Sequence, residues 1–136
     1  MKINYITSHD QYEAFLETFD SAKIALDFET TGLQAHLARA RLLQICSADP
    51  ESQDRTVHVL DLFKCEHDER LKNFIESREM LIIHNANFDI QLLLSLNIDF
   101  KNKIFCTYLA ERVLRAGFKD KKISPQAGNV YFEDVS

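Results

Sequence analysis

Two carboxylates with one residue between them, Asp27 and Glu29, stand at the end of an apolar run that begins at Lys23. In a β-strand, alternate side chains point to the same face, so these two are predicted to lie together, about 6–7 Å apart. At an effective dielectric constant of about 20, they repel each other by about 2–3 kcal/mol. A divalent cation relieves that repulsion, so the pair predicts a metal-binding site.

A second pair of polar residues, Asn85 and Asp89, follows an apolar strand-like segment at 80–84. A separation of four residues puts both on one helix face, which is otherwise apolar, so Asp89 borders buried surface. Taken alone, the pair has two interpretations: a ligand set, or a local role in which Asn85 caps the helix and Asp89 interacts with the helix dipole. With Asp27 and Glu29, Asp89 makes three carboxylates, which suit a pair of hard divalent cations.

The elements that must position these residues follow from hydrophobic periodicity and turn chemistry. Ser8 or Asp10 can cap a first helix, which should end at about residue 20. A short turn at 49–54 implies that the strands on either side of it pair antiparallel. The expected order continues with strands at 23–29, 39–47 and 56–62, a helix at 66–77, a strand at 80–84, a helix from 85, and a helix at 105–115 that ends before Gly117. The sequence therefore predicts an α/β fold with a mixed sheet and helices on both faces.

The composition is that of one globular domain, with 136 residues, 46% hydrophobic and 27% charged. The net charge of −5 is unevenly distributed. Residues 1–100 hold 9 Lys and Arg against 17 Asp and Glu, whereas residues 101–122 hold 7 against 2. A basic segment on an acidic body suits a protein that binds a phosphate backbone beside a carboxylate metal site. A solvated basic helix face has the same pattern.

The three cysteines, Cys46, Cys65 and Cys106, fit neither a disulfide framework nor a zinc-ligand pattern. They are predicted to be free thiols in a reducing compartment. No apolar run approaches the length of a membrane span, and the first residues lack a signal-peptide pattern. We therefore expect a cytoplasmic protein with no membrane partner.

The segment Asp27-Phe28-Glu29-Thr30-Thr31-Gly32-Leu33 resembles the first motif of the DEDD 3′–5′ exonucleases, and Asn85-x-x-x-Asp89 resembles their second. Segments 41–45, 59–62 and 107–114 are similar to the elements around those motifs in RNase D and in the proofreading domain of bacterial family A DNA polymerases. The resemblance implies an RNase H-like domain over residues 1–118, shortened at its C-terminal end and followed by an irregular tail over residues 119–136. Its sheet would have five strands, three antiparallel and then parallel ones.

The resemblance also implies an activity and a role for each residue of the motifs. Such enzymes hydrolyse phosphodiester bonds from the 3′ end of single-stranded DNA or RNA, with two Mg²⁺ or Mn²⁺ ions that stabilise the attacking and leaving oxygens. Asp27 would bind both ions, Glu29 the ion that activates water, and Asp89 the second ion. Phe28 and His84 are interpreted as packing residues. Substrate binding is assigned to Thr30, Thr31, Gly32, Leu33, Asn85 and Phe88.

The third motif of these enzymes, a Tyr or His followed by a catalytic Asp on a later helix, is absent in its usual form. The nearest match is Tyr131 and Asp134, which are three residues apart, a spacing that still shares one side of a helix. Asp134 is therefore a candidate metal ligand and Tyr131 a candidate orienting group or general base. Three hypotheses stay open: an exonuclease with a degenerate third motif, or one supplied by a second chain or a C-terminal part; a weak or inactive nucleic-acid-binding module; and a structural assembly subunit. The first two motifs do not discriminate DNA from RNA.

Overall fold

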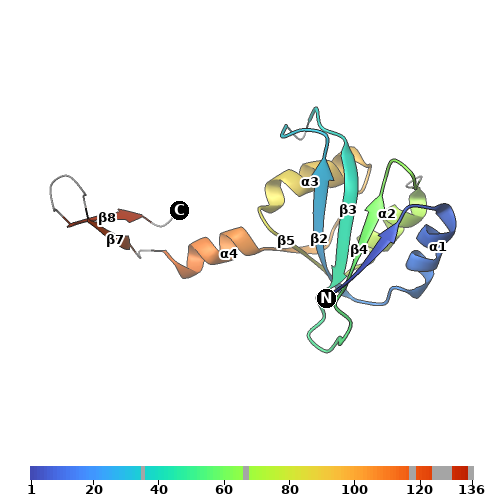
Figure 1. Ribbon diagram of the computed structural model, residues 1–136, viewed down its shortest axis with the longest axis horizontal. Helices are drawn as coiled ribbons and strands as arrows, with labels where there is room; N and C mark the ends of the chain where they lie inside the picture. Colours follow the sequence, from blue (N-terminus) through green and yellow to red (C-terminus); the bar gives the residue numbers. More distant parts are fainter. Residues whose placement is uncertain (35, 66–67, 117–118, 124–129, 135–136) are drawn as a thin grey trace.

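The computed structural model of the chain describes residues 1–34, 36–65, 68–116, 119–123 and 130–134 (Figure 1). Ser8, one of the two predicted helix caps, accepts a hydrogen bond from the N–H of Gln11 and so begins the first helix. The described elements, in chain order, are β1 (Lys2–Ile6), α1 (His9–Thr18), β2 (Lys23–Thr30), β3 (Ala40–Ser47), β4 (Thr56–Asp61), α2 (Glu69–Glu76), β5 (Met80–Ile83), α3 (Ala86–Ser95), β6 (Lys103–Cys106), α4 (Thr107–Leu114), β7 (Lys119–Ile123) and β8 (Val130–Asp134).

Six strands form one mixed sheet in the order β1-β4-β3-β2-β5-β6. β3 pairs antiparallel with both β2 and β4, whereas β5 is parallel to β2 and to β6. The predicted arrangement of antiparallel and then parallel strands is confirmed, but the predicted number of five strands was wrong. β1 adds a sixth strand, which is parallel to β4 and has Ile6 as its only buried residue. β6 has four residues and leads directly into α4, so the helix predicted at 105–115 included the last two residues of this strand.

One face of the sheet carries the hydrophobic core. Along β2 the buried side chains are Ile24, Leu26 and Phe28, which is the period of two expected for a strand with one buried face. α1, α2 and α3 all contribute side chains to this core, whereas Asp27 and Glu29, on the other face of β2, are exposed. The buried helical side chains of this core are Tyr12, Phe15, Leu71, Phe74, Ile75, Ala86, Leu92 and Leu93.

Beyond β6, α4 extends away from the sheet and carries the β7–β8 hairpin at its far end (Figure 1). α4 has no buried side chain. β7 and β8 pair antiparallel, with Lys119 opposite Asp134 and Ile123 opposite Val130. The described part of the segment predicted to be an irregular tail is therefore a hairpin. The division into a domain over residues 1–118 and a tail stays a prediction.

The three cysteines are free thiols, as predicted. Cys65 is buried in the core, and burial raises the pKa of its thiol, so it packs as a small hydrophobic residue. Within the described ranges, no helix has both the length and the apolar character needed to cross a lipid bilayer.

Candidate active site

The carboxylates of Asp27 and Glu29 lie on the open face of β2, and one side chain joins them. Gln44 stands directly opposite Asp27 on β3. Its amide Nε2 donates to Oδ2 of Asp27 at 3.3 Å and lies 3.5 Å from Oε1 of Glu29. An amide nitrogen carries two hydrogens, so one Gln44 side chain can hold both carboxylates in place. The prediction that the two carboxylates share a face is consistent with this common partner.

Asp89, on the first turn of α3, is held against the same strand. Its side chain is 4% exposed, and its Oδ1 accepts a hydrogen bond of 3.1 Å from the backbone N–H of Phe28. Phe28 stands between Asp27 and Glu29 in the sequence, so this bond brings the second predicted motif to the first. α3 is therefore linked to β2 at Phe28, and the prediction that Asp89 shares a metal site with Asp27 and Glu29 stays a prediction.

The electrostatics of the three carboxylates indicate concentrated negative charge. The pKa of Asp89 is raised to about 6, mainly by burial and to a smaller extent by the nearby Asp27 charge, while the hydrogen bond from Phe28 opposes the shift. The pKa of Asp27 is raised by burial and then by the charge of Glu29. A cation placed among these groups would favour their charged forms.

Gln44 and His84 also lie at this site, although neither was predicted to be a site residue. His84 follows β5, and its Nδ1 lies 2.9 Å from Oγ1 of Thr107. Its positive form lowers the pKa of Asp27. His84 and Thr107 line a hollow of about 340 Å³ together with Asp27 and Gln44. No local sequence pattern marks either residue, because strand pairing brings both here: Gln44 is opposite Asp27 on β3, and His84 follows β5, which pairs with β2 as far as Ala25 and Ile82.

The predicted substrate turn after β2 is closed by hydrogen bonds. Thr30 Oγ1 donates to the carbonyl of Gly32 at 2.5 Å. The N–H of Thr31 donates to the carbonyl of Arg39 at 3.1 Å, so this backbone donor is already engaged. Leu33 is 96% exposed and lines a hollow of about 410 Å³ together with Thr31, Gly32, Gln34, Leu37 and Ala38. The group that this turn presents to a substrate is therefore the apolar side chain of Leu33, and the backbone N–H of Thr31 is not free to bind one.

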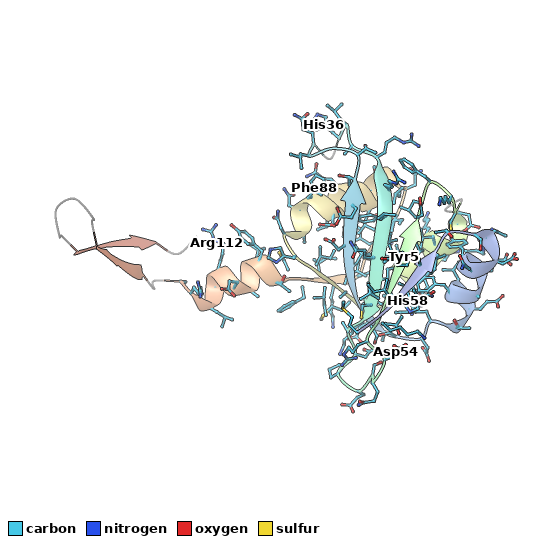
Figure 2. The ribbon with its side chains drawn as sticks, in the orientation of Figure 1. Tyr5, His36, Asp54, His58, Phe88 and Arg112 are labelled. Carbon is cyan, nitrogen blue, oxygen red and sulfur yellow. The ribbon has the colours of Figure 1, made fainter. Side chains whose placement is uncertain are left out.

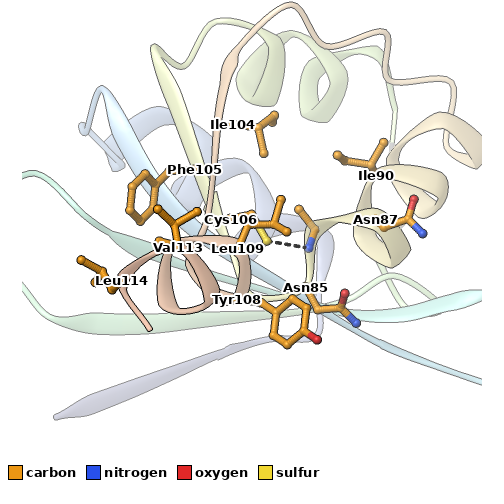
Figure 3. Close-up of a pocket in the computed structure, with 12 residues that line it drawn as sticks. Asn85, Asn87, Ile90, Ile104, Phe105, Cys106, Tyr108, Leu109, Val113 and Leu114 are labelled. Atoms are coloured by element: carbon orange, nitrogen blue, oxygen red, sulfur yellow. Dashed lines mark hydrogen bonds between the residues drawn. The ribbon is translucent and has the colours of Figure 1, made fainter. Parts of the chain in front are cut away.

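Of the other two predicted substrate residues, Asn85 immediately precedes α3 and Phe88 lies in its first turn. Asn85 is the N-cap residue, with a left-handed backbone (φ 53°) and no capping bond from its side chain. Phe88 is half-buried against the core, at the same end of the molecule as His36 in the loop after β2 (Figure 2). Asn85 and Asn87 line a pocket of about 880 Å³ with apolar side chains of β6 and α4, whereas Asp27, Glu29 and Asp89 do not line it (Figure 3).

Tyr131 and Asp134, the candidate third motif, lie in β8 and not on a helix. The structure places β8 beyond the far end of α4, and so does not bring these two residues to β2 (Figure 1). Their roles as an orienting group and a metal ligand stay predictions.

The donor set suits divalent cations. Carboxylate oxygens are the ligands that Mg²⁺ and Mn²⁺ prefer, and Asp27, Glu29 and Asp89 supply them from two neighbouring elements. In the part of the chain that the structure describes, no three such side chains form a ready-made metal cluster. Burial is the main cause of the raised pKa of both Asp27 and Asp89, and a cation bound beside these carboxylates would favour their charged forms.

The sheet order and these paired motifs define a nuclease-type fold. The chain belongs to the 3′–5′ exonuclease family, whose sequence profile matches residues 3–119. No curated protein sequence matches the chain.

Solved structures of exonucleases have the same fold. The exonuclease domain of Nibbler from Aedes aegypti is 15% identical, with a TM-score of 0.65 over 85% of this chain and 57% of that one. RNase D from Escherichia coli is 18% identical, with a TM-score of 0.63 over 79% of this chain and 28% of that one. NrnC from Brucella melitensis bound to pGG is 23% identical, with a TM-score of 0.59 over 87% of this chain and 55% of that one. At these identities the similarity establishes the RNase H-like fold, and the chain spans little more than half, or less, of each structure.

Proposed function

We propose that this chain is a metal-dependent 3′–5′ exonuclease that removes nucleotides from the 3′ end of single-stranded nucleic acid. The observation that carries the proposal is the contact between its two motifs: the Asp89 carboxylate is bonded to the backbone of Phe28, between Asp27 and Glu29. Membership of the 3′–5′ exonuclease family supports the reaction class. The RNA or oligonucleotide ligands of its structural neighbours, such as the pGG bound to NrnC, support the substrate class.

Each residue of the site has a role in this reaction. Asp27, Glu29 and Asp89 would hold two Mg²⁺ or Mn²⁺ ions, which supply charge stabilisation for the attacking and leaving oxygens of the phosphodiester. Gln44 orients Asp27 and Glu29 through its amide. Leu33, which is almost fully exposed in the turn after β2, would contact the terminal base.

Digestion of a single-stranded oligonucleotide labelled at its 5′ end tests the proposal. DNA and RNA versions are incubated with Mn²⁺, Mg²⁺ or EDTA, beside the same oligonucleotide labelled at its 3′ end. We expect a ladder of successively shorter 5′-labelled products and immediate release of the 3′ label as a mononucleotide, in metal only. Internal cleavage, or no shortening with either metal, contradicts the proposal.

Two variants control for the site. Asp27→Asn should abolish the ladder, since it removes a charged ligand and keeps the size of the side chain. Glu51→Gln removes one carboxylate from the β3–β4 turn and should leave the ladder unchanged. That turn is at the opposite end of the sheet from the site, where Figure 2 shows Asp54 far from His36.

A further inference from the structure

Two arginines lie over one exposed aromatic ring at the end of the sheet that carries the carboxylates. Phe63, two residues after β4, is 46% exposed. The guanidinium carbon of Arg39 is 4.7 Å from the centre of its ring, and that of Arg41 is 5.5 Å away. We call these three residues the arginine–phenylalanine cluster.

The backbone fixes the cluster beside the candidate active site. The N–H of Arg39 donates to Oγ1 of Thr31 at 3.0 Å, in the turn that follows Glu29. Arg41 is the extra residue of a β-bulge, because Glu29 pairs with Leu42 and Thr30 pairs with Ala40. β4 is separated from β2 by one strand, so the ends of these two strands are about 10 Å apart.

The positive charges of Arg39 and Arg41 have no paired carboxylate among the described residues. Among the residues that the structure describes, neither guanidinium forms an ion pair with a carboxylate or a side-chain hydrogen bond, whereas Arg70 and Arg115 do. Contact of an exposed arginine with an aromatic ring is worth only about 0.5–1 kcal/mol, and the two positive groups repel each other. Lys64, next to Phe63, adds a third exposed cation on an otherwise acidic body.

These features match the chemistry of single-stranded nucleic acid. Arginine donates paired hydrogen bonds to phosphate oxygens, and an exposed aromatic ring stacks on a base of any sequence. We propose that the arginine–phenylalanine cluster is a binding subsite for the nucleotides on the 5′ side of the scissile phosphodiester. Arg39 and Arg41 bind backbone phosphates, and Phe63 stacks on a base. This inference rests on the proposed function, because it assumes that the 3′ end lies at Asp27.

Binding measured without hydrolysis tests the subsite. The anisotropy of 5′-labelled single-stranded 12-mers of DNA and of RNA is titrated with the full chain in EDTA, over a series of salt concentrations. For the double variant R39Q/R41Q we expect weaker binding and a salt slope smaller by about 1.4, since each phosphate contact on a single strand contributes about 0.7. Phe63→Leu should weaken binding roughly tenfold by loss of base stacking. The matched control is Arg55→Gln, in the β3–β4 turn at the opposite end of the sheet.

Hydrolysis in Mn²⁺ separates this inference from the proposed function. The double variant should raise the KM for the 12-mer much more than the KM for a dinucleotide, because a dinucleotide has only one nucleotide on the 5′ side of its scissile bond. If R39Q/R41Q binds the 12-mer with the affinity and salt slope of Arg55→Gln, or if the wild-type chain binds no 12-mer, the inference is overturned. If the wild-type chain hydrolyses neither substrate, the proposed function fails, and the anisotropy result still decides whether the cluster binds nucleic acid.

Discussion

The two faces of β2 differ in what they contribute. Ile24 and Leu26 point to the helix-covered face and are almost completely buried, whereas Asp27 and Glu29 point to the open face, where Gln44 joins them. Side chains alternate along the strand, so the buried face anchors β2 in the core and thereby holds the carboxylates of the open face in place. Substitutions on the covered face should therefore change the free energy of unfolding, and those on the open face should change activity.

The largest expected effect is on the open face. Asp27→Asn should lower the rate of shortening of a 5′-labelled oligonucleotide in Mn²⁺ by about a thousandfold, because charge stabilisation worth several kcal/mol is lost. The free energy of unfolding without metal should not fall, because burial and the charge of Glu29 disfavour the Asp27 carboxylate. Urea unfolding of the same preparation checks this second part. A variant that loses stability in parallel with activity would contradict the separation of the two faces.

On the covered face, Leu26→Ala should lower the free energy of unfolding by about 2–5 kcal/mol, because it leaves a cavity in the core. Leu26 is 3% exposed. Ala25→Ser, the neighbouring change on the open face, is the control and should cost less than about 1 kcal/mol. Urea denaturation monitored by circular dichroism measures both. Equal losses for the two variants would show that both faces of β2 carry the core.

Asp89 lies on α3 and accepts a hydrogen bond from the backbone of β2. Its raised pKa predicts that the free energy of unfolding depends on pH. Its native pKa is raised from 3.8 to about 6, so between these values the folded protein holds a proton that the unfolded chain releases. The free energy of unfolding should therefore fall by roughly 2–3 kcal/mol as the pH rises through this window without metal. Asp89→Asn, whose side-chain oxygen can still accept from Phe28, should remove this fall. Urea midpoints across the window measure it, and equal slopes for the two proteins would refute the assignment to Asp89.

The smallest predicted effect concerns Gln44. Gln44→Leu should reduce activity roughly tenfold, because bonds from an amide to charged groups are worth about 1.5–3 kcal/mol, and those of Gln44 are long. The Mn²⁺ concentration for half-maximal activity should rise as well, since Asp27 and Glu29 lose their common partner. Gln91→Leu, on an exposed position of α3, is the control. An unchanged metal requirement would show that Gln44 does not orient the carboxylates.

Much of this architecture could be predicted from local patterns. The alternation at 23–29 predicted β2 and its face, and the strands at 39–47 and 56–62 lie within a residue or two of β3 and β4. The periodicity from Asn85 predicted α3. These segments have strong hydrophobic periods, and the type of such segments depends little on the rest of the fold.

The features that could not be predicted depend on tertiary context. β1 and β6 are strands of five and four residues at the two edges of the sheet, so their hydrophobic patterns are too short to identify them. Gln44 and His84 join the site through strand register, which the hydrophobic pattern of an isolated strand does not specify. The cluster of Arg39 and Arg41 over Phe63 likewise requires the β-bulge beside Glu29.

Metal-dependent stabilisation of the folded chain tests the central claim most directly, because it requires no turnover. Unfolding in urea is measured for wild type and Asp27→Asn, with and without Mn²⁺. A ligand that binds only the folded state adds about 2.7 kcal/mol at a hundred times its Kd. Mn²⁺ at a hundred times its Kd should stabilise the wild-type chain by about this amount and leave Asp27→Asn unchanged. Equal stabilisation of both proteins, or of neither, would contradict the assignment of Asp27, Glu29 and Asp89 as a metal site.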